Sequence, residues 1–342
     1  MSASGTSARP RWQRALVPIL LVPIAALGLW SVAAHLHREE IPPAPFEEAR
    51  DLPPLPAPAD NGWTVLTRAP EGAFDDDPPT LDLLRGSDGP PDLRALAALH
   101  DQLAAWSPPD EARAAIDAAL ARPRFAIACP LELEVQCPTL ELLRAHRIAA
   151  ALALRDAQAG WHQEALERAE RLLRLDRDAL ETSRTIIAAM VSAAAAREAI
   201  ELTALLGAEI GAQDADAITD GVAAQLDATE LALVSLEPQR WSLEPALIGE
   251  AILLRRGLAV VAADDASWAM DRGRIARAFD DYFASAIAYA RDVAHAPPPE
   301  RPTPDATWRF FDPLGTAALD ALAIELALHV ERFEDEAFAA ED

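Results

Sequence analysis

The sequence predicts an all-α protein, with one N-terminal transmembrane helix followed by an extracytoplasmic bundle or irregular array of antiparallel helices. Two observations carry this prediction. An uncharged run extends from Ala15 to Ala34, with arginines on its N-terminal side. Residues 61–295 are rich in alanine and leucine, and their apolar side chains recur at helical spacing, which is typical of packed helices.

The N-terminal 37 residues predict a membrane anchor. A bilayer core of ~30 Å needs roughly 20 apolar residues, and residues 15–37 meet that length. Residues 1–14 contain three arginines and no acid, so the positive-inside rule makes them a cytoplasmic tail. The predicted location is the inner (cytoplasmic) membrane, with the C-terminal body in the periplasm or outside the cell. The small residues Val32-Ala33-Ala34 leave a cleaved signal peptide as the alternative, although its apolar run is usually only about 7 to 15 residues long.

Composition restricts the classes of function. The 342 residues carry a formal charge of -25, and all 30 basic residues are arginine. Such an acid excess repels phosphate backbones, so we expect no nucleic-acid partner. The absence of lysine excludes a Walker-A site, a kinase-type lysine and a pyridoxal Schiff base within this chain. The arginine- and alanine-rich composition is typical of a GC-rich, bacterial genome.

Two proline-rich stretches border the predicted body. Residues 38–60 contain seven prolines and predict a stiff spacer between membrane and body. A second proline-rich linker is predicted over residues 296–313. Helical periodicity then predicts a C-terminal helix over residues 314–342, ending near Ala340.

Capping signals predict two helix starts. Ser107-Pro108-Pro109-Asp110 combines a capping serine with a proline at the first helical position, and predicts a helix from Glu111 to Ala121. Asp178 to Glu181 has a similar pattern and predicts the start of a long helix to Leu206. The spacing within that helix predicts one buried stripe, made of Ile187, Met190, Val191 and Ala194.

Residues 140–175 predict a helical hairpin. One helix runs from Leu140 to Ala159, Gly160 allows the turn, and a second helix runs from His162 to Leu175. The second helix carries acid and arginine pairs four residues apart, in the favoured order. These pairs, which mark its predicted solvent face, are Glu164/Arg168, Glu167/Arg171 and Glu170/Arg174.

This hairpin resembles a tetratricopeptide repeat. The family's small-residue positions are matched by Ala153, Gly160 and Ala165, and Gln163-Glu164-Ala165-Leu166 looks like the opening of its second helix. Asp156 stands where the repeat has an aromatic residue, and Arg177 where it has the closing proline. The resemblance covers about 34 residues without a second copy at that period. It implies a protein-binding role.

Cys129 and Cys137 are the only cysteines of the chain. In an oxidising compartment, two cysteines of one exported domain most often form a disulfide. Apolar and acidic side chains alternate over residues 131–135, as in a short strand. A straight strand would hold the two sulfurs too far apart for a disulfide. Pro130 and Pro138 favour a folded loop, and hence the disulfide. No sequence motif predicts a metal site or a cofactor.

Two polar residues lie on apolar helix faces. If residues 245–255 are helical, Glu250 shares its face with leucines and alanines, and His146 has similar neighbours. A buried arginine partner for Glu250 and a hydrogen-bonded core histidine explain both residues. The alternative is a general acid in a cleft, and Glu250 and His146 are the candidates for this catalytic role.

The sequence thus predicts an interaction or scaffolding module of the bacterial cell envelope, with a protein partner. The alternative is an envelope hydrolase acting on glycans with Glu250, a chemistry that usually requires a second carboxylate.

Overall fold

The computed structural model describes residues 38–80, 93–132, 137–211, 219–236, 243–262 and 271–292, together with Ala296, Pro297 and Pro299. The predicted tail (1–14), anchor (15–37) and C-terminal helix (314–342) lie outside the described residues, as does nearly all of the second linker. No helix of the described residues has both the length and the apolar character that a bilayer crossing requires. In the described ranges every regular element is a helix, which confirms the all-α class.

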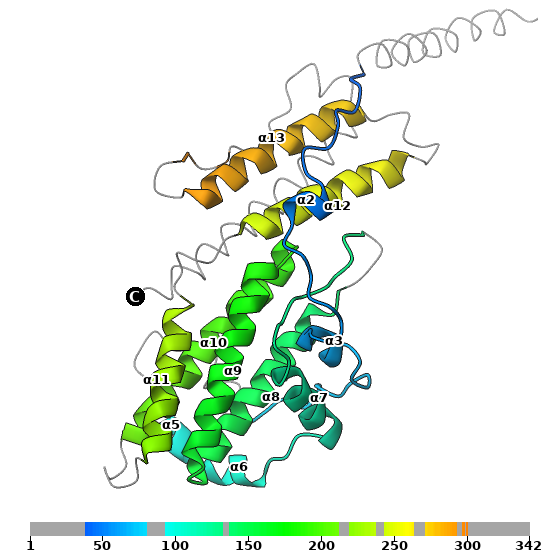
Figure 1. The fold of residues 1–342 in the computed structure, drawn as a ribbon. Coiled ribbons are helices and arrows are strands. Elements are labelled where there is room, and N and C mark those ends of the chain that lie inside the picture. The colour runs from blue at the N-terminus through cyan, green and yellow to red at the C-terminus, as the bar shows by residue number, and fades with distance from the viewer. Residues whose placement is uncertain are drawn as a thin grey trace, which may run out of the picture.

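Four helices form the central bundle, in which α8, α9 and α10 pack pairwise and α11 lies on α9 (Figure 1). They are α8 (Thr139–Gln158), α9 (His162–Thr182), α10 (Ile186–Gly211) and α11 (Asp220–Val234). The hairpin predicted over residues 140–175 is present as α8 and α9. Its turn contains Gly160 with a φ of 85°, a left-handed conformation that glycine adopts without strain.

Smaller helices cover two sides of this bundle. α3 (Gly62–Leu66) and α7 (Asp110–Leu120) pack together and against α8. α5 (Leu93–Ala98) contacts α10, and α6 (His100–Ala105) contacts α8. The loop after α7 is anchored by Asn61, whose amide donates to the carbonyl of Ala126 at 2.8 Å.

A second pair of helices, α12 (Glu244–Ala262) and α13 (Arg272–Arg291), lies across one end of the bundle (Figure 1). Their apolar faces form a separate core around the fully buried Phe283. The backbone of α12 approaches the α9–α10 junction closely at Gly249. A Cβ atom there would overlap the carbonyl oxygen of Arg184, so only glycine permits this contact.

Residues 38–56, here called the strap, run along α12 and α13 before the chain enters the bundle (Figure 1). The backbone amide of Glu39 donates to the Asp271 carboxylate at 3.1 Å, and Arg184 donates to the carbonyl of Pro53 at 2.7 Å. Leu52 is buried in the core between α12 and α13. The sequence predicts a stiff spacer here, but the structure folds this segment onto the body and forms the short helix α2 (Glu48–Asp51) within it.

Three local predictions are wrong. The side chain of Ser107 does not cap α7, which begins at Asp110 after Pro109. Asp178 does not begin a helix, because α9 continues to Thr182 and the next helix begins at Ile186. The predicted stripe is not the buried one, since Ile187 is 57% exposed. The buried residues of α10 include Ala188, Ser192, Ala195, Ala199 and Leu202.

Candidate anion-binding pocket

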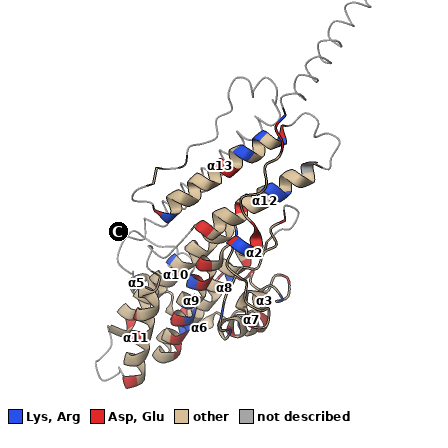
Figure 2. Ribbon diagram, turned by 45° about the horizontal axis from the view of Figure 1, so that its top comes forward, with Lys and Arg blue, Asp and Glu red and all other residues tan. Residues whose placement is uncertain are grey.

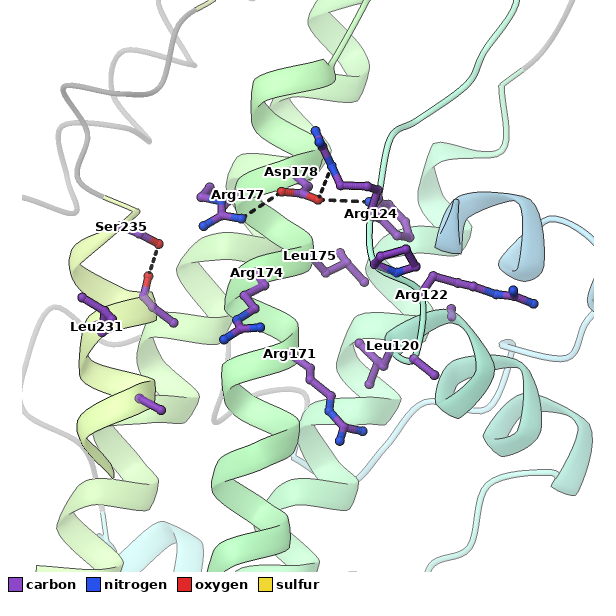
Figure 3. A pocket seen from close by; sticks show the side chains of 16 residues that line it. Leu120, Arg122, Arg124, Arg171, Arg174, Leu175, Arg177, Asp178, Leu231 and Ser235 are labelled. Carbon is purple, nitrogen blue, oxygen red and sulfur yellow. Dashed lines mark hydrogen bonds and ion pairs between the residues drawn. The ribbon is translucent and has the colours of Figure 1, made fainter. Parts of the chain in front are cut away.

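An open cavity of about 610 Å³ lies between α9, α11 and the segment that ends α7 (Figure 3). Five of its lining residues are arginines and one is an aspartate. The charged residues are Arg122, Arg124, Arg171, Arg174, Arg177 and Asp178. This cluster of arginines occurs in a chain whose overall charge is -25.

Three of the arginines form a row along α9. Arg171, Arg174 and Arg177 are three residues apart, so a rise of 1.5 Å per residue spreads them over about 9 Å of helix. Figure 3 shows them along α9, with Arg122 and Arg124 on the facing segment. The side chains of Arg171 and Arg174 are 50% and 63% exposed. The row therefore offers accessible N–H donors at regular intervals.

The intrahelical pairs leave these donors available. Arg171 lies 3.2 Å from Glu167, and Arg174 pairs with Glu170, as the sequence predicts. Exposed ion pairs of this kind stabilise a protein by only about 0–1 kcal/mol. A guanidinium has five N–H donors, so a ligand carboxylate can bind an arginine that keeps its glutamate. Figure 2 shows acidic and basic residues interleaved along α9.

The remaining predicted pair, Glu164 with Arg168, is replaced by contacts of Arg168 with two other helices. Arg168 donates to Asp117 of α7 at 2.8 Å, and lies 3.8 Å from Asp156 of α8. This arginine thus links α9 to two neighbouring helices and contributes to packing. The row that faces the pocket begins at Arg171.

Asp178 holds the two walls of the pocket together. Its carboxylate accepts from the backbone amide of Phe125 at 3.2 Å and lies 3.3 Å from Arg124. Arg177 donates to the other oxygen at 3.1 Å (Figure 3). One buried carboxylate therefore orients Arg124 on one wall and Arg177 on the other.

One edge of the pocket is apolar. Leu231 of α11 lines the cavity and is 72% exposed, and Val234, one helical turn further along, is also exposed. Leu175 of α9 is buried at the base. The site therefore combines an array of cations with an apolar rim, which fits an anionic ligand that also carries an apolar group.

His146 lies in the bundle core, away from solvent. Its Nε2 lies 3.1 Å from Asp176 of α9, and its Nδ1 lies 3.9 Å from Glu198 of α10. Glu198 in turn accepts from Arg147 at 2.6 and 2.8 Å. Burial lowers the pKa of His146, but the neighbouring carboxylate of Asp176 outweighs it, and the net pKa is raised. Burial also raises the pKa of Asp176.

The surroundings of His146 allow no substrate to reach it. The void that it lines has a volume of about 10 Å³, roughly that of a single water probe. The imidazole instead joins α8, α9 and α10 through carboxylates on two other helices. Sequence reasoning placed His146 on an apolar face but could not identify Asp176 and Glu198 as its neighbours.

Glu250 lies at the contact between α12 and the start of α10. Its Oε1 accepts from the backbone amide of Ile186 at 3.0 Å. Ile186 is the first residue of α10, and its amide has no acceptor within the helix. The carboxylate of Glu250 thus caps a helix from another element, and the favourable interaction with the positive helix end accounts for an acid on this apolar face.

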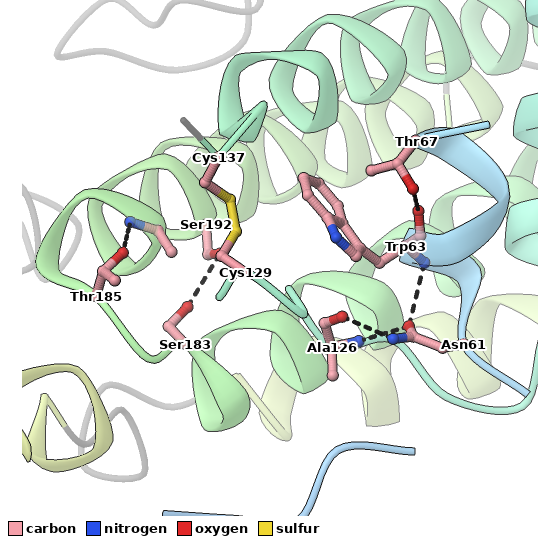
Figure 4. Close-up of a disulfide and its surroundings, with 10 residues drawn as sticks. Asn61, Trp63, Thr67, Ala126, Cys129, Cys137, Ser183, Thr185 and Ser192 are labelled. Atoms are coloured by element: carbon pink, nitrogen blue, oxygen red, sulfur yellow. Dashed lines mark hydrogen bonds between the residues drawn. A yellow bond between two sulfur atoms is a disulfide. The ribbon is translucent and has the colours of Figure 1, made fainter. Parts of the chain in front are cut away.

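The structure confirms the pairing of Cys129 with Cys137, whose Cα atoms are 5.6 Å apart (Figure 4). The bond closes the segment between the loop after α7 and the start of α8. Cys129 is buried against the bundle core, near Trp63 of α3. Among the described residues, no group of three His, Cys, Asp or Glu side chains is placed to hold a metal ion.

The arginine pocket is the site that sequence reasoning missed. The row along α9 is visible as an i, i+3, i+6 pattern, but the sequence favours a solvated face for it. Arg122 and Arg124 lie about 50 positions earlier, and nothing local indicates that their segment packs opposite α9. Comparisons with protein-family models, curated proteins and solved structures each find no match.

Proposed function

We propose that the chain is a membrane-anchored, extracytoplasmic protein of the bacterial cell envelope that binds an acidic segment of a partner protein in the arginine-lined pocket. The observation that carries this proposal is the row of Arg171, Arg174 and Arg177 in one cavity with Arg124, which lies beside Asp178 of α9; Arg122 lines the same cavity but donates to the carbonyl of Ala59. Arginine is well suited to carboxylates because its planar group donates two parallel hydrogen bonds.

The length of the row favours a peptide over a small anion. A single phosphate or carboxylate reaches one or two guanidinium groups, whereas the row extends over about 9 Å. An acidic helix carries carboxylates every three or four residues and matches this spacing. The exposed Leu231 adds a contact for an apolar side chain between the acids.

The proposed location rests on the N-terminal sequence and on the disulfide. Residues 15–37 have the length and flanking charges of an anchor, and disulfides persist in oxidising compartments. The hydrolase alternative has less support, because His146 is shielded and Glu250 already accepts from a helix amide. Glycan hydrolysis requires two carboxylates that reach the substrate.

The pocket is tested by charge reversal in the full chain, purified in detergent. The probe is a fluorescein-labelled peptide with glutamates at i, i+3, i+4 and i+7 and one central phenylalanine, followed by anisotropy. Arg174→Glu should weaken binding more than about tenfold, since a charge-assisted hydrogen bond contributes ~1.5–3 kcal/mol. The matched control is Arg113→Glu, an exposed arginine of α7 outside the pocket, which should change binding less than about twofold at the same change in net charge. Equal losses in both variants would reject the pocket as the binding site.

The location is tested separately. A reporter that is active only in the periplasm, fused after Asp342, should give signal. Alkaline carbonate should leave the protein in the membrane fraction. A cytoplasmic C-terminus, or full release by carbonate, would contradict the proposed location.

A further inference from the structure

The sequence contains a segment with the properties of the ligand proposed for the pocket. Residues 331–342, here called the acidic segment, carry six acidic side chains and one arginine. Two phenylalanines, Phe333 and Phe338, lie between the acids. The segment lies outside the described residues, in the region for which the sequence predicts a helix.

We propose that the acidic segment occupies the arginine-lined pocket of its own chain until an acidic partner displaces it. This inference rests on the proposed function, because it requires the pocket to bind acidic peptides. It goes further by naming the segment that occupies the pocket when no partner is bound. Binding of the partner then becomes a competition between two acidic peptides for one site.

The spacing of the charges supports this occupant. If the predicted helix extends through the acidic segment, Glu331, Glu334, Asp335 and Phe338 share one face, because they are spaced i, i+3, i+4 and i+7. Arg171, Arg174 and Arg177 are three residues apart along α9, so they too recur about once per helical turn. Two helices side by side would thus bring carboxylates opposite guanidinium groups over successive turns.

The apolar residues fit the same arrangement. Phe338 follows the acids on the shared face, and Leu231 of α11 lines the cavity and is exposed. Ala228 and Ala232 of α11 line the same side of the cavity. Contact between Phe338 and Leu231 would remove apolar surface of both side chains from water.

Covalent linkage makes a weak interaction sufficient. The segment begins 32 residues after Pro299, and with residues 314–330 in the helix that the sequence predicts, linker and helix together span up to about 70 Å. Covalent attachment of this kind holds the segment at an effective concentration of up to the millimolar range. The pocket is therefore filled even when the acidic segment has only modest affinity, and a free partner must bind more tightly to replace it.

The first test maps the contact directly in the full chain. p-Benzoylphenylalanine replaces Phe338, and the irradiated protein is digested and analysed by mass spectrometry. We expect intramolecular cross-links to α11 around Leu231 or to α9 between Arg171 and Asp178. Glu334→Gln with Asp335→Asn should lower their yield severalfold. Cross-links to other elements, or between two chains, would overturn the proposal.

The second test uses competition with the fluorescent glutamate peptide described above. Neutralising the segment by Glu331→Gln, Glu334→Gln and Asp335→Asn should tighten probe binding at least about threefold. The control neutralises Glu71, Asp76 and Asp77, three exposed acids in the loop after α3, with the same change in net charge, and should leave binding nearly unchanged.

The two proposals fail in different ways. Equal binding to the wild-type and neutralised chains, with sensitivity to Arg174→Glu, would reject the acidic segment as occupant and keep the pocket function. Binding that Arg174→Glu leaves unchanged would reject the pocket function. The cross-link at position 338 reports on the segment in either case.

Discussion

The carboxylate of Glu250 accepts a hydrogen bond of 3.0 Å from the backbone amide of Ile186, the residue that begins α10. Thr185, the residue before α10, caps the amide of Ala188, and the side chain of Glu250 from α12 adds an acceptor for the amide of Ile186. The α12–α13 pair is thus coupled to the bundle through a helix end as well as through apolar contacts.

Glu250→Ala should lower the free energy of unfolding by about 1–2 kcal/mol, because removal of a capping acceptor typically has this effect. Glu250→Gln keeps an acceptor oxygen and loses only the interaction of the charge with the helix end, so its loss should be ~0.3–1 kcal/mol. Urea unfolding followed by circular dichroism measures both. If both variants lose the same amount of stability, and more than these values, the negative charge itself is needed. That result would fit the ion pair with a buried arginine that the sequence predicts for Glu250.

Gly249→Ala should destabilise the protein by about 1–3 kcal/mol, the usual range for overpacking, because the added Cβ overlaps the carbonyl of Arg184. The matched control is Gly207→Ala in α10, where a Cβ meets no atom within 4 Å. That change should stabilise the protein by ~0.5–1 kcal/mol through helix propensity. Thermal melts of the two variants should shift in opposite directions, and a shared direction would contradict the close approach.

The disulfide should contribute about 2–3 kcal/mol, which is the loop-closure value for a bond between cysteines eight residues apart. Cys129→Ala with Cys137→Ala should lower the melting temperature, and reductant should lower that of the wild type but not that of the variant. Protein alkylated without reduction should carry no modified cysteine. Two alkylated thiols in protein from its native compartment would argue against an oxidising location.

Stability should fall as pH rises through the range in which His146 and Asp176 titrate. Both pKa values are raised in the folded chain, from ordinary values of 6.5 and 3.8, so the folded state holds more protons than the unfolded state. These additional protons dissociate as pH rises through the raised pKa values, and the stability that they contribute is then lost. Arg147 and Glu198 are the other charged groups that face the imidazole.

The comparison uses His146→Gln with Asp176→Asn, which removes both titrating groups and keeps hydrogen-bonding side chains. Above pH 6.5 the melting temperature of the wild type should decline relative to that of this variant. Parallel pH profiles would show that the pair does not titrate differently on folding.

Sequence reasoning was accurate where local signals decide the structure. The hairpin of α8 and α9 is predicted within two residues at both sides of its turn, because Gly160 and the helical periodicity are properties of the segment itself. The short separation of Cys129 and Cys137, with adjacent prolines, similarly limits that loop. These features depend little on distant residues.

The sequence failed where distant contacts override local preference. Asp178 resembles a helix cap, yet its carboxylate binds the amide of Phe125 and orients Arg124. The actual start of α10 has a local cap, since Thr185 accepts from the amide of Ala188, and Glu250, 64 residues away, accepts from Ile186. Alanine along much of α10 also gives a weak periodic signal, so the wrong face was assigned to Ile187. The contacts of Asp178 and Glu250 are information that no local window contains, whereas the cap at Thr185 is a local signal that sequence reasoning missed.

The strap has a consequence for the order in which the chain acquires its structure during synthesis. Glu39 is made early, but its partner Asp271 follows 232 residues later. A ribosome adds about 5–20 residues each second, so the strap emerges at least ten seconds before its docking surface exists. During that interval the bundle helices, whose contacts are closer in sequence, have time to assemble first. The pairing of α12 with α13 and the seating of the strap are therefore the final steps, and a chain arrested before residue 271 would leave the strap undocked.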